Sequence, residues 1–121
     1  MSAEGIQELK RVASDALARF EDRVPYLLWN EANAVTVVGK NPPFDIETYH
    51  DALDAWEKDL RLQLKLSAEL RDAQYALAEV LASRRRRRGA LNEINENQNK
   101  RDSDLKRGLE RVRTLRTLRP R

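Results

Sequence analysis

Apolar residues recur at spacings of three and four along most of the chain, and this spacing constrains the fold more than any other feature. Between residues 3 and 23 the apolar positions are Ile6, Leu9, Val12, Ala13, Ala16, Leu17 and Phe20. Such spacing draws one stripe along an α-helix. The chain contains 17 Leu and 14 Ala against 14 Val, Ile and Thr together, a bias that favours helix over strand. An all-α protein is therefore predicted.

The few glycines and prolines divide the 121 residues into segments. Pro25 suits the first turn of a helix, which indicates two shorter helices before residue 39. Residues 34–38 are rich in β-branched side chains, but no second strand exists to pair with them, so a helix is favoured there as well. Asp45 is a suitable N-cap for the next helix. The predicted single domain, residues 1–121, has N-terminal helices at 1–39, an acidic central helix at 45–83, an arginine-rich tip at 84–89 and a basic C-terminal helix at 90–121.

The short connection between the two long helices predicts that they are antiparallel neighbours. The predicted fold is a long, coiled-coil-like helical hairpin with the two shorter helices packed at its open end. Centring the turn between residues 86 and 87 places Leu109 opposite Leu64 and Arg101 opposite Asp72. Apolar side chains then meet apolar ones and basic meet acidic, so a contact between Asp72 and Arg101 is predicted.

The formal net charge of +3 conceals two halves of opposite sign. Residues 1–83 contain 9 basic and 15 acidic side chains, a net charge of −6. Residues 84–121 contain 14 basic and 5 acidic side chains, a net charge of +9. This asymmetry indicates a partner for the basic half, either nucleic acid or an acidic protein surface. The alternative is that the acidic helix neutralises the basic one internally.

The most distinctive local feature is a run of five consecutive arginines, residues 84–88. Adjacent like charges repel one another, so such a run costs stability unless something neutralises it. At a hairpin tip they project into solvent, where planar guanidinium groups bind phosphate well. The alternative is a solvated turn that complements the end of the preceding helix. The basic segment contains no aromatic residue, so contacts with the phosphate backbone are expected and base stacking is not. The predicted binding residues are Arg84, Arg85, Arg86, Arg87, Arg88, Arg107, Arg111, Arg113 and Arg116.

Catalytic and metal-binding patterns are missing from the sequence. Cysteine is absent and His50 is the one histidine, which excludes disulfides and thiolate chemistry. Glu47 and His50 match half of a di-iron motif, but a second histidine is lacking, so no metal and no cofactor is predicted. The protein is therefore not expected to be an enzyme. Without a membrane-spanning run or a secretory signal, a cytoplasmic location, or one inside a viral particle, is expected.

Aromatic and leucine residues indicate contacts between subunits. Trp29, Trp56 and Tyr49 cluster around the first turn between helices, where they form either core or an interface anchor. The predicted interface residues are Trp29, Trp56, Tyr49, Leu62, Leu66 and Leu70, in a homo- or hetero-oligomer. The predicted function is a non-enzymatic helical subunit of a larger assembly that binds nucleic-acid phosphates or an acidic partner. Alternatives are a viral or phage structural or assembly protein, and an inhibitor that occupies a partner's nucleic-acid channel.

Overall fold

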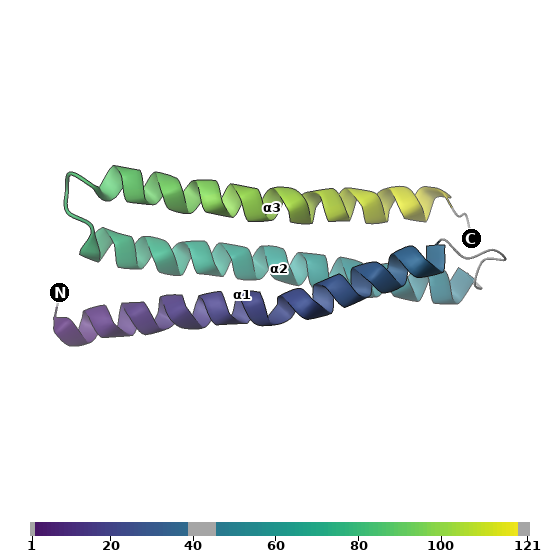
Figure 1. The fold of residues 1–121 in the computed structure, drawn as a ribbon, viewed down its shortest axis with the longest axis horizontal. Helices are drawn as coiled ribbons and strands as arrows, with labels where there is room; N and C mark the ends of the chain where they lie inside the picture. Colours follow the sequence, from purple (N-terminus) through teal and green to yellow (C-terminus); the bar gives the residue numbers. More distant parts are fainter. Residues whose placement is uncertain (1, 39–45, 119–121) are drawn as a thin grey trace.

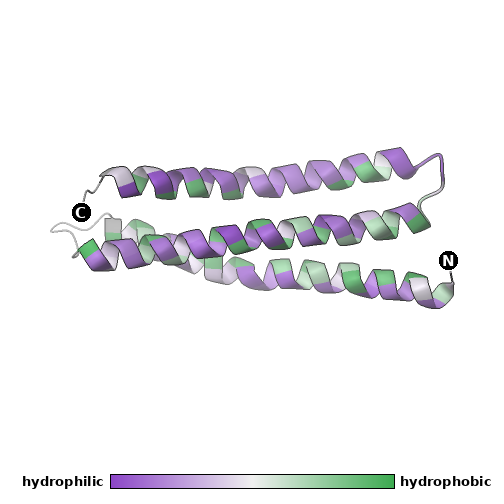
Figure 2. Cartoon of the chain, turned by 180° about the vertical axis from the view of Figure 1, so that it is seen from behind, coloured by the Kyte–Doolittle hydropathy of each residue, from purple (hydrophilic) through white to green (hydrophobic). Residues whose placement is uncertain are grey.

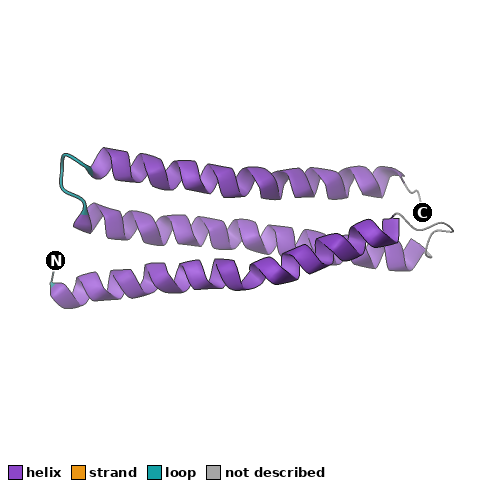
Figure 3. Cartoon of the chain, in the orientation of Figure 1, coloured by secondary structure: helices purple, strands orange, loops and turns teal. Residues whose placement is uncertain are grey.

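The computed structural model describes residues 2–38 and 46–118, and these ranges form three helices (Figure 1). The helices are α1 (Ala3–Val38), α2 (Ile46–Leu81) and α3 (Arg87–Leu118). No strand occurs within the described ranges (Figure 3), so the all-α prediction is confirmed. The predicted N-cap Asp45 lies outside them. None of the three helices is long and apolar enough to span a lipid bilayer.

The N-terminal segment is one helix of 36 residues, so the prediction of two shorter helices is wrong. Pro25 lies inside α1, where its missing N–H removes one backbone hydrogen bond. The chain stays helical because α1 buries apolar side chains on both sides of this residue, Ala16 before it and Ala34 and Val37 after it. The axis of α1 changes direction in the middle of the helix (Figure 1), as expected of a helix that contains proline.

α2 is the central helix of the molecule. It packs along both α1 and α3, whereas the backbones of α1 and α3 rarely approach each other. Both outer helices run antiparallel to α2, so the N-terminus lies at the same end as the α2–α3 loop (Figure 1). The N-terminal residues therefore follow α2 along its length rather than packing at the open end alone, although Ala34 and Val37 do join Trp56 in the buried cluster there. Arg19 of α1, for example, lies 3.9 Å from Glu69, in the half of α2 nearer the loop.

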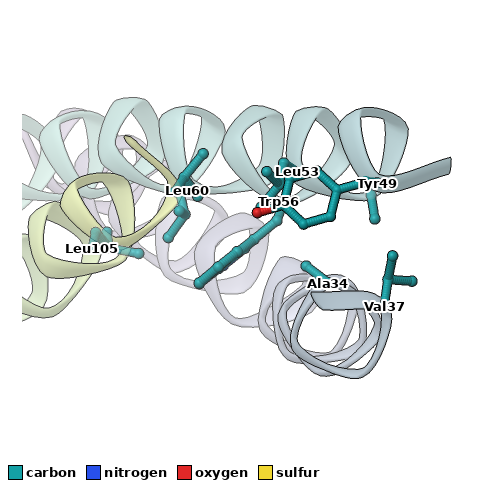
Figure 4. Packing of buried hydrophobic residues seen from close by; sticks show 9 residues of the cluster. Ala34, Val37, Tyr49, Leu53, Trp56, Leu60 and Leu105 are labelled. Atoms are coloured by element: carbon teal, nitrogen blue, oxygen red, sulfur yellow. The ribbon is translucent and has the colours of Figure 1, made fainter. Parts of the chain in front are cut away.

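The core lies toward the open end of the hairpin. Trp56 is 1% exposed and stands between the helices with Leu53 and Leu60 around it (Figure 4). The buried cluster consists of Ala34, Val37, Tyr49, Ala52, Leu53, Trp56, Leu60, Leu105 and Val112. α3 contributes few of these residues because most of its surface is hydrophilic, as Figure 2 shows. At Gly108 the α3 backbone passes close to α2: a Cβ atom built there would lie 2.8 Å from Leu60 Cδ2.

Polar side chains fix α1 against α2 inside this packing. Asp59 is 7% exposed and accepts hydrogen bonds from Arg23, at 3.0 Å, and from Asn30. Gln63 is also buried, and its amide donates to the backbone carbonyl of Phe20 at 3.2 Å. These contacts join residues about thirty to forty positions apart along the chain and so set the position of α1 on α2.

The register of the hairpin differs from the predicted one. Arg101 donates to the hydroxyl of Ser67 at 3.0 Å and to its carbonyl at 3.2 Å. Asp72 instead accepts from Arg71 at 2.8 Å, so the prediction of an Asp72–Arg101 contact is wrong. The cause is the turn: α3 begins at Arg87, which leaves 82–86 as the connection and moves its centre toward α2. Each residue of α3 therefore faces a residue of α2 about five positions earlier than predicted.

Candidate nucleic-acid interface

The five arginines surround the turn between α2 and α3. The backbone N–H groups of Arg86 and Arg87 both donate to the carbonyl of Ser83, at 3.0 and 2.9 Å, which closes the turn. Three of the arginines lie in the connection, and Arg87 and Arg88 begin α3. Because the chain reverses here, their side chains leave the backbone in different directions. All five are exposed, and none forms an ion pair with a carboxylate of the described residues.

An aromatic side chain from α2 lies beside the arginines. Tyr75 lines a shallow pocket of about 400 Å³ together with Arg84, Arg87, Arg88, Leu91 and Asn92. The guanidinium of Arg71, one turn earlier, lies 3.9 Å from the centre of the Tyr75 ring. The basic segment itself contains no aromatic residue, but α2 places Tyr75 beside it. If the turn had been centred near Arg84 in the prediction, Tyr75 would have been placed opposite Glu93, next to Asn92. The pocket could then have been predicted from the sequence.

The other predicted arginines lie along α3 and differ in their surroundings. Arg107 pairs with Asp104 at 2.5 Å and Arg113 with Glu110 at 4.0 Å, each within α3 and each exposed. Arg111 is exposed, without a carboxylate partner among the described residues. The outer surface of α3 thus mixes positive and negative charges, so the densest positive charge is at the tip.

Arg116 has a structural role. Its guanidinium donates to Asp54 and to Glu57 and so joins α3 to α2 at the open end. The hydrogen bond from Arg116 holds the pKa of Glu57 below its ordinary value of 4.5, although partial burial acts in the opposite direction. Burial also lowers the pKa of Arg116, but the bonds to the two carboxylates outweigh it and the pKa is raised. Internal neutralisation of the basic helix by α2 is therefore seen at Arg116 and not at the tip.

The predicted interface residues separate into buried and exposed groups. Tyr49, Trp56, Leu66 and Leu70 are buried within the chain, and Leu62 is half-buried. Trp29, by contrast, is 69% exposed. Tyr26 and Leu28 are each 57% exposed. Tyr26 lies one turn from Trp29 on the same side of α1, whereas Leu28 points to a different side, toward α3. Among the predicted interface residues, Trp29 is therefore the one most accessible to another subunit.

His50 lies near the start of α2, and its ring meets the Tyr49 ring edge-on with centroids 5.7 Å apart. No group of three or more His, Asp and Glu side chains suited to a metal ion occurs among the residues that the structure describes. No protein-family model matches the chain, and neither the curated proteins nor the solved structures contain a match. Its function is therefore inferred from its own charges and geometry.

Proposed function

We propose that this chain is a non-enzymatic helical subunit that binds nucleic acid through phosphate contacts at the tip, residues 84–88. The observation that supports this most is the exposure of five consecutive arginines without carboxylate partners in the described structure. Like charges held together repel, so this arrangement costs stability in the free protein. An anionic partner removes that cost on binding.

Arginine is well suited to phosphate because its planar guanidinium donates two parallel hydrogen bonds and stays charged at neutral pH. Side chains that leave a turn in several directions can reach successive phosphates along a strand. Phosphate binding also releases the condensed counterions of the nucleic acid, which provides affinity without reading the sequence. Arg107 and Arg111 extend the positive surface along α3, although Asp104 reduces their effect.

A second candidate is a role in protein assembly, which the exposed side chains of Tyr26, Leu28 and Trp29 favour. Leu28 also borders a groove of about 330 Å³ between α1 and α3, whose floor includes Trp56 and Leu60. Aromatic side chains at such surfaces often supply much of the energy of a protein interface. A viral or phage structural subunit would use this surface together with the basic tip.

Fluorescence anisotropy with a labelled oligonucleotide tests the main proposal. Between about 50 and 200 mM salt, three to five phosphate contacts predict a loss of affinity of roughly 40- to 500-fold on a duplex and roughly 20- to 130-fold on a single strand. Replacing all five arginines of the tip by Ser should weaken binding at least about tenfold and flatten the salt dependence. The charge-matched control replaces five other exposed basic residues by Ser: Lys10, Arg11, Lys58, Arg61 and Lys65.

The control should retain most of the affinity, because it carries the same net charge with an intact tip. If both variants lost the same affinity for the oligonucleotide, binding would depend on net charge alone and the proposed role of the tip would be contradicted. A pull-down separates the candidates: a nucleic-acid partner is lost after nuclease treatment, whereas a protein partner remains. Light scattering that gives the same defined oligomer for the unmodified chain and for the tip variant would favour the assembly role.

A further inference from the structure

We infer that the tip binds single-stranded nucleic acid, with one base stacked on Tyr75 and the adjoining phosphates on Arg84, Arg87 and Arg88. This inference rests on the proposed function and names the form of nucleic acid that the tip selects. The observation behind it is a pocket of about 400 Å³ between α2 and the start of α3, which Tyr75 and three arginines line together.

The ring of Tyr75 packs against a cation from its own helix. Arg71 lies one helical turn before it, with its guanidinium 3.9 Å from the ring centre. Arg71 is itself anchored by Asp72 at 2.8 Å. A ring whose orientation is set before binding loses little conformational entropy when a base stacks on it. Tyr75 is half-buried and lines the hollow, so part of its surface remains accessible to a ligand.

The other walls of the pocket suit a nucleotide. Leu91 provides an apolar surface, and the Asn92 amide offers both a donor and an acceptor to a base edge. Arg84, Arg87 and Arg88 provide the positive charge for phosphates on either side of that base. The volume lies within the range of small-ligand sites. Stacking on an aromatic ring accepts any base, so little sequence preference is expected.

A base in a duplex is paired and stacked on both sides, so its face cannot reach Tyr75. Only an unpaired base, in a single strand or at a frayed end, can turn into the pocket. Phosphate contacts by themselves would not discriminate in this way, because duplexes carry the denser charge. A preference for single strands would therefore report the contribution of Tyr75.

The experiment compares Tyr75→Ala with the unmodified chain on two labelled strands of equal length, one with bases and one abasic. Tyr75→Ala should bind the base-containing strand about five- to tenfold more weakly, the lower range for one stacked base, and should bind the abasic strand unchanged. Tyr75→Phe should keep the affinity because it keeps the ring. Tyr26→Ala is the matched control, since Tyr26 also has an arginine, Arg23, 4.4 Å from its ring centre but is in α1.

Photo-crosslinking of the unmodified chain to a strand containing 5-bromouracil gives a second measurement that does not depend on how the variants fold. The crosslink should map to the peptide containing Tyr75, and a crosslink at Tyr26 or Trp29 instead would overturn the inference. The inference is also overturned if Tyr75→Ala weakens binding of both strands equally, or of neither. In that case the proposed function still holds as long as binding depends on the arginines of the tip. If the unmodified chain binds neither strand in a salt-dependent way, the proposed function itself fails.

Discussion

Asp59 is a buried carboxylate that joins α2 to α1. It is buried and accepts hydrogen bonds from Arg23 and Asn30, both in α1. Sequence spacing could not reveal this, because it identifies pairs within one helix, such as Glu57 with Arg61, whose charged atoms lie 3.3 Å apart. The partners of Asp59 are about thirty positions away, and only the path of α1 past Pro25 brings them close.

Asp59→Ala should lower the free energy of unfolding by about 2–3 kcal/mol, because it leaves Asn30 and the guanidinium of Arg23 without their buried acceptor. Urea denaturation followed by circular dichroism measures this change. Asp72→Ala is the matched control: Asp72 is exposed and pairs with its sequence neighbour Arg71, so a change within about 0.5 kcal/mol is expected. Similar values for both variants would show that Asp59 does not fasten α1 to α2.

At the scale of the helices, sequence predicted their presence better than their arrangement. The three-and-four spacing identified the helical segments, since that pattern is local. The register was missed because it depends on where α3 begins, and five consecutive arginines carry no apolar pattern that marks this point. The same error hid the pocket, because Tyr75 and Asn92 become neighbours only in the observed register. The turn does lie among the arginines, but α3 begins at Arg87 rather than at the predicted residue 90.

Disulfide crosslinking tests the register directly, because the chain has no native cysteine. The double variant Leu60→Cys with Gly108→Cys should oxidise readily. A Cβ atom at position 108 lies 3.6 Å from Leu60 Cγ, so the two introduced side chains approach to about disulfide distance. The pair Lys65→Cys with Gly108→Cys represents the register predicted from sequence and should remain reduced. Non-reducing electrophoresis under native conditions distinguishes them, and preferential oxidation of the second pair would contradict the observed hairpin.

Over the whole molecule, the two ends of the hairpin differ in whether their arginines are paired with carboxylates. At the open end, Asp54 and Glu57 surround Arg116 and join α3 to α2 beside the core. At the tip, the arginines meet no carboxylate among the described residues. The end beside the core is therefore neutralised, whereas the tip keeps its positive charge, which the proposed function assigns to phosphate binding. Stability and binding should respond to different substitutions, at opposite ends of the hairpin.

Acid should weaken the neutralised end first. Arg116 holds the pKa of Glu57 below 4.5, so the folded state binds its proton less readily than the unfolded state. The stabilisation is therefore complete above about pH 4.5 and is lost as the pH falls through the lower folded-state value. Glu57→Gln should reduce stability near neutral pH and flatten its decline as the pH falls below about 5, as measured by urea denaturation at a series of acidic pH values.

Glu8→Gln is the control for this prediction, because the pKa of Glu8 is also lowered by a hydrogen bond from an arginine, Arg11. That pair lies fully exposed within α1 and connects no two helices, so solvent screens it and its loss should change stability little. If both substitutions flatten the acid response equally, the response comes from surface charge in general. If only Glu57→Gln does so, the link between α2 and α3 sets the acid limit of the fold, and phosphate binding at the distant tip should persist in that variant at neutral pH.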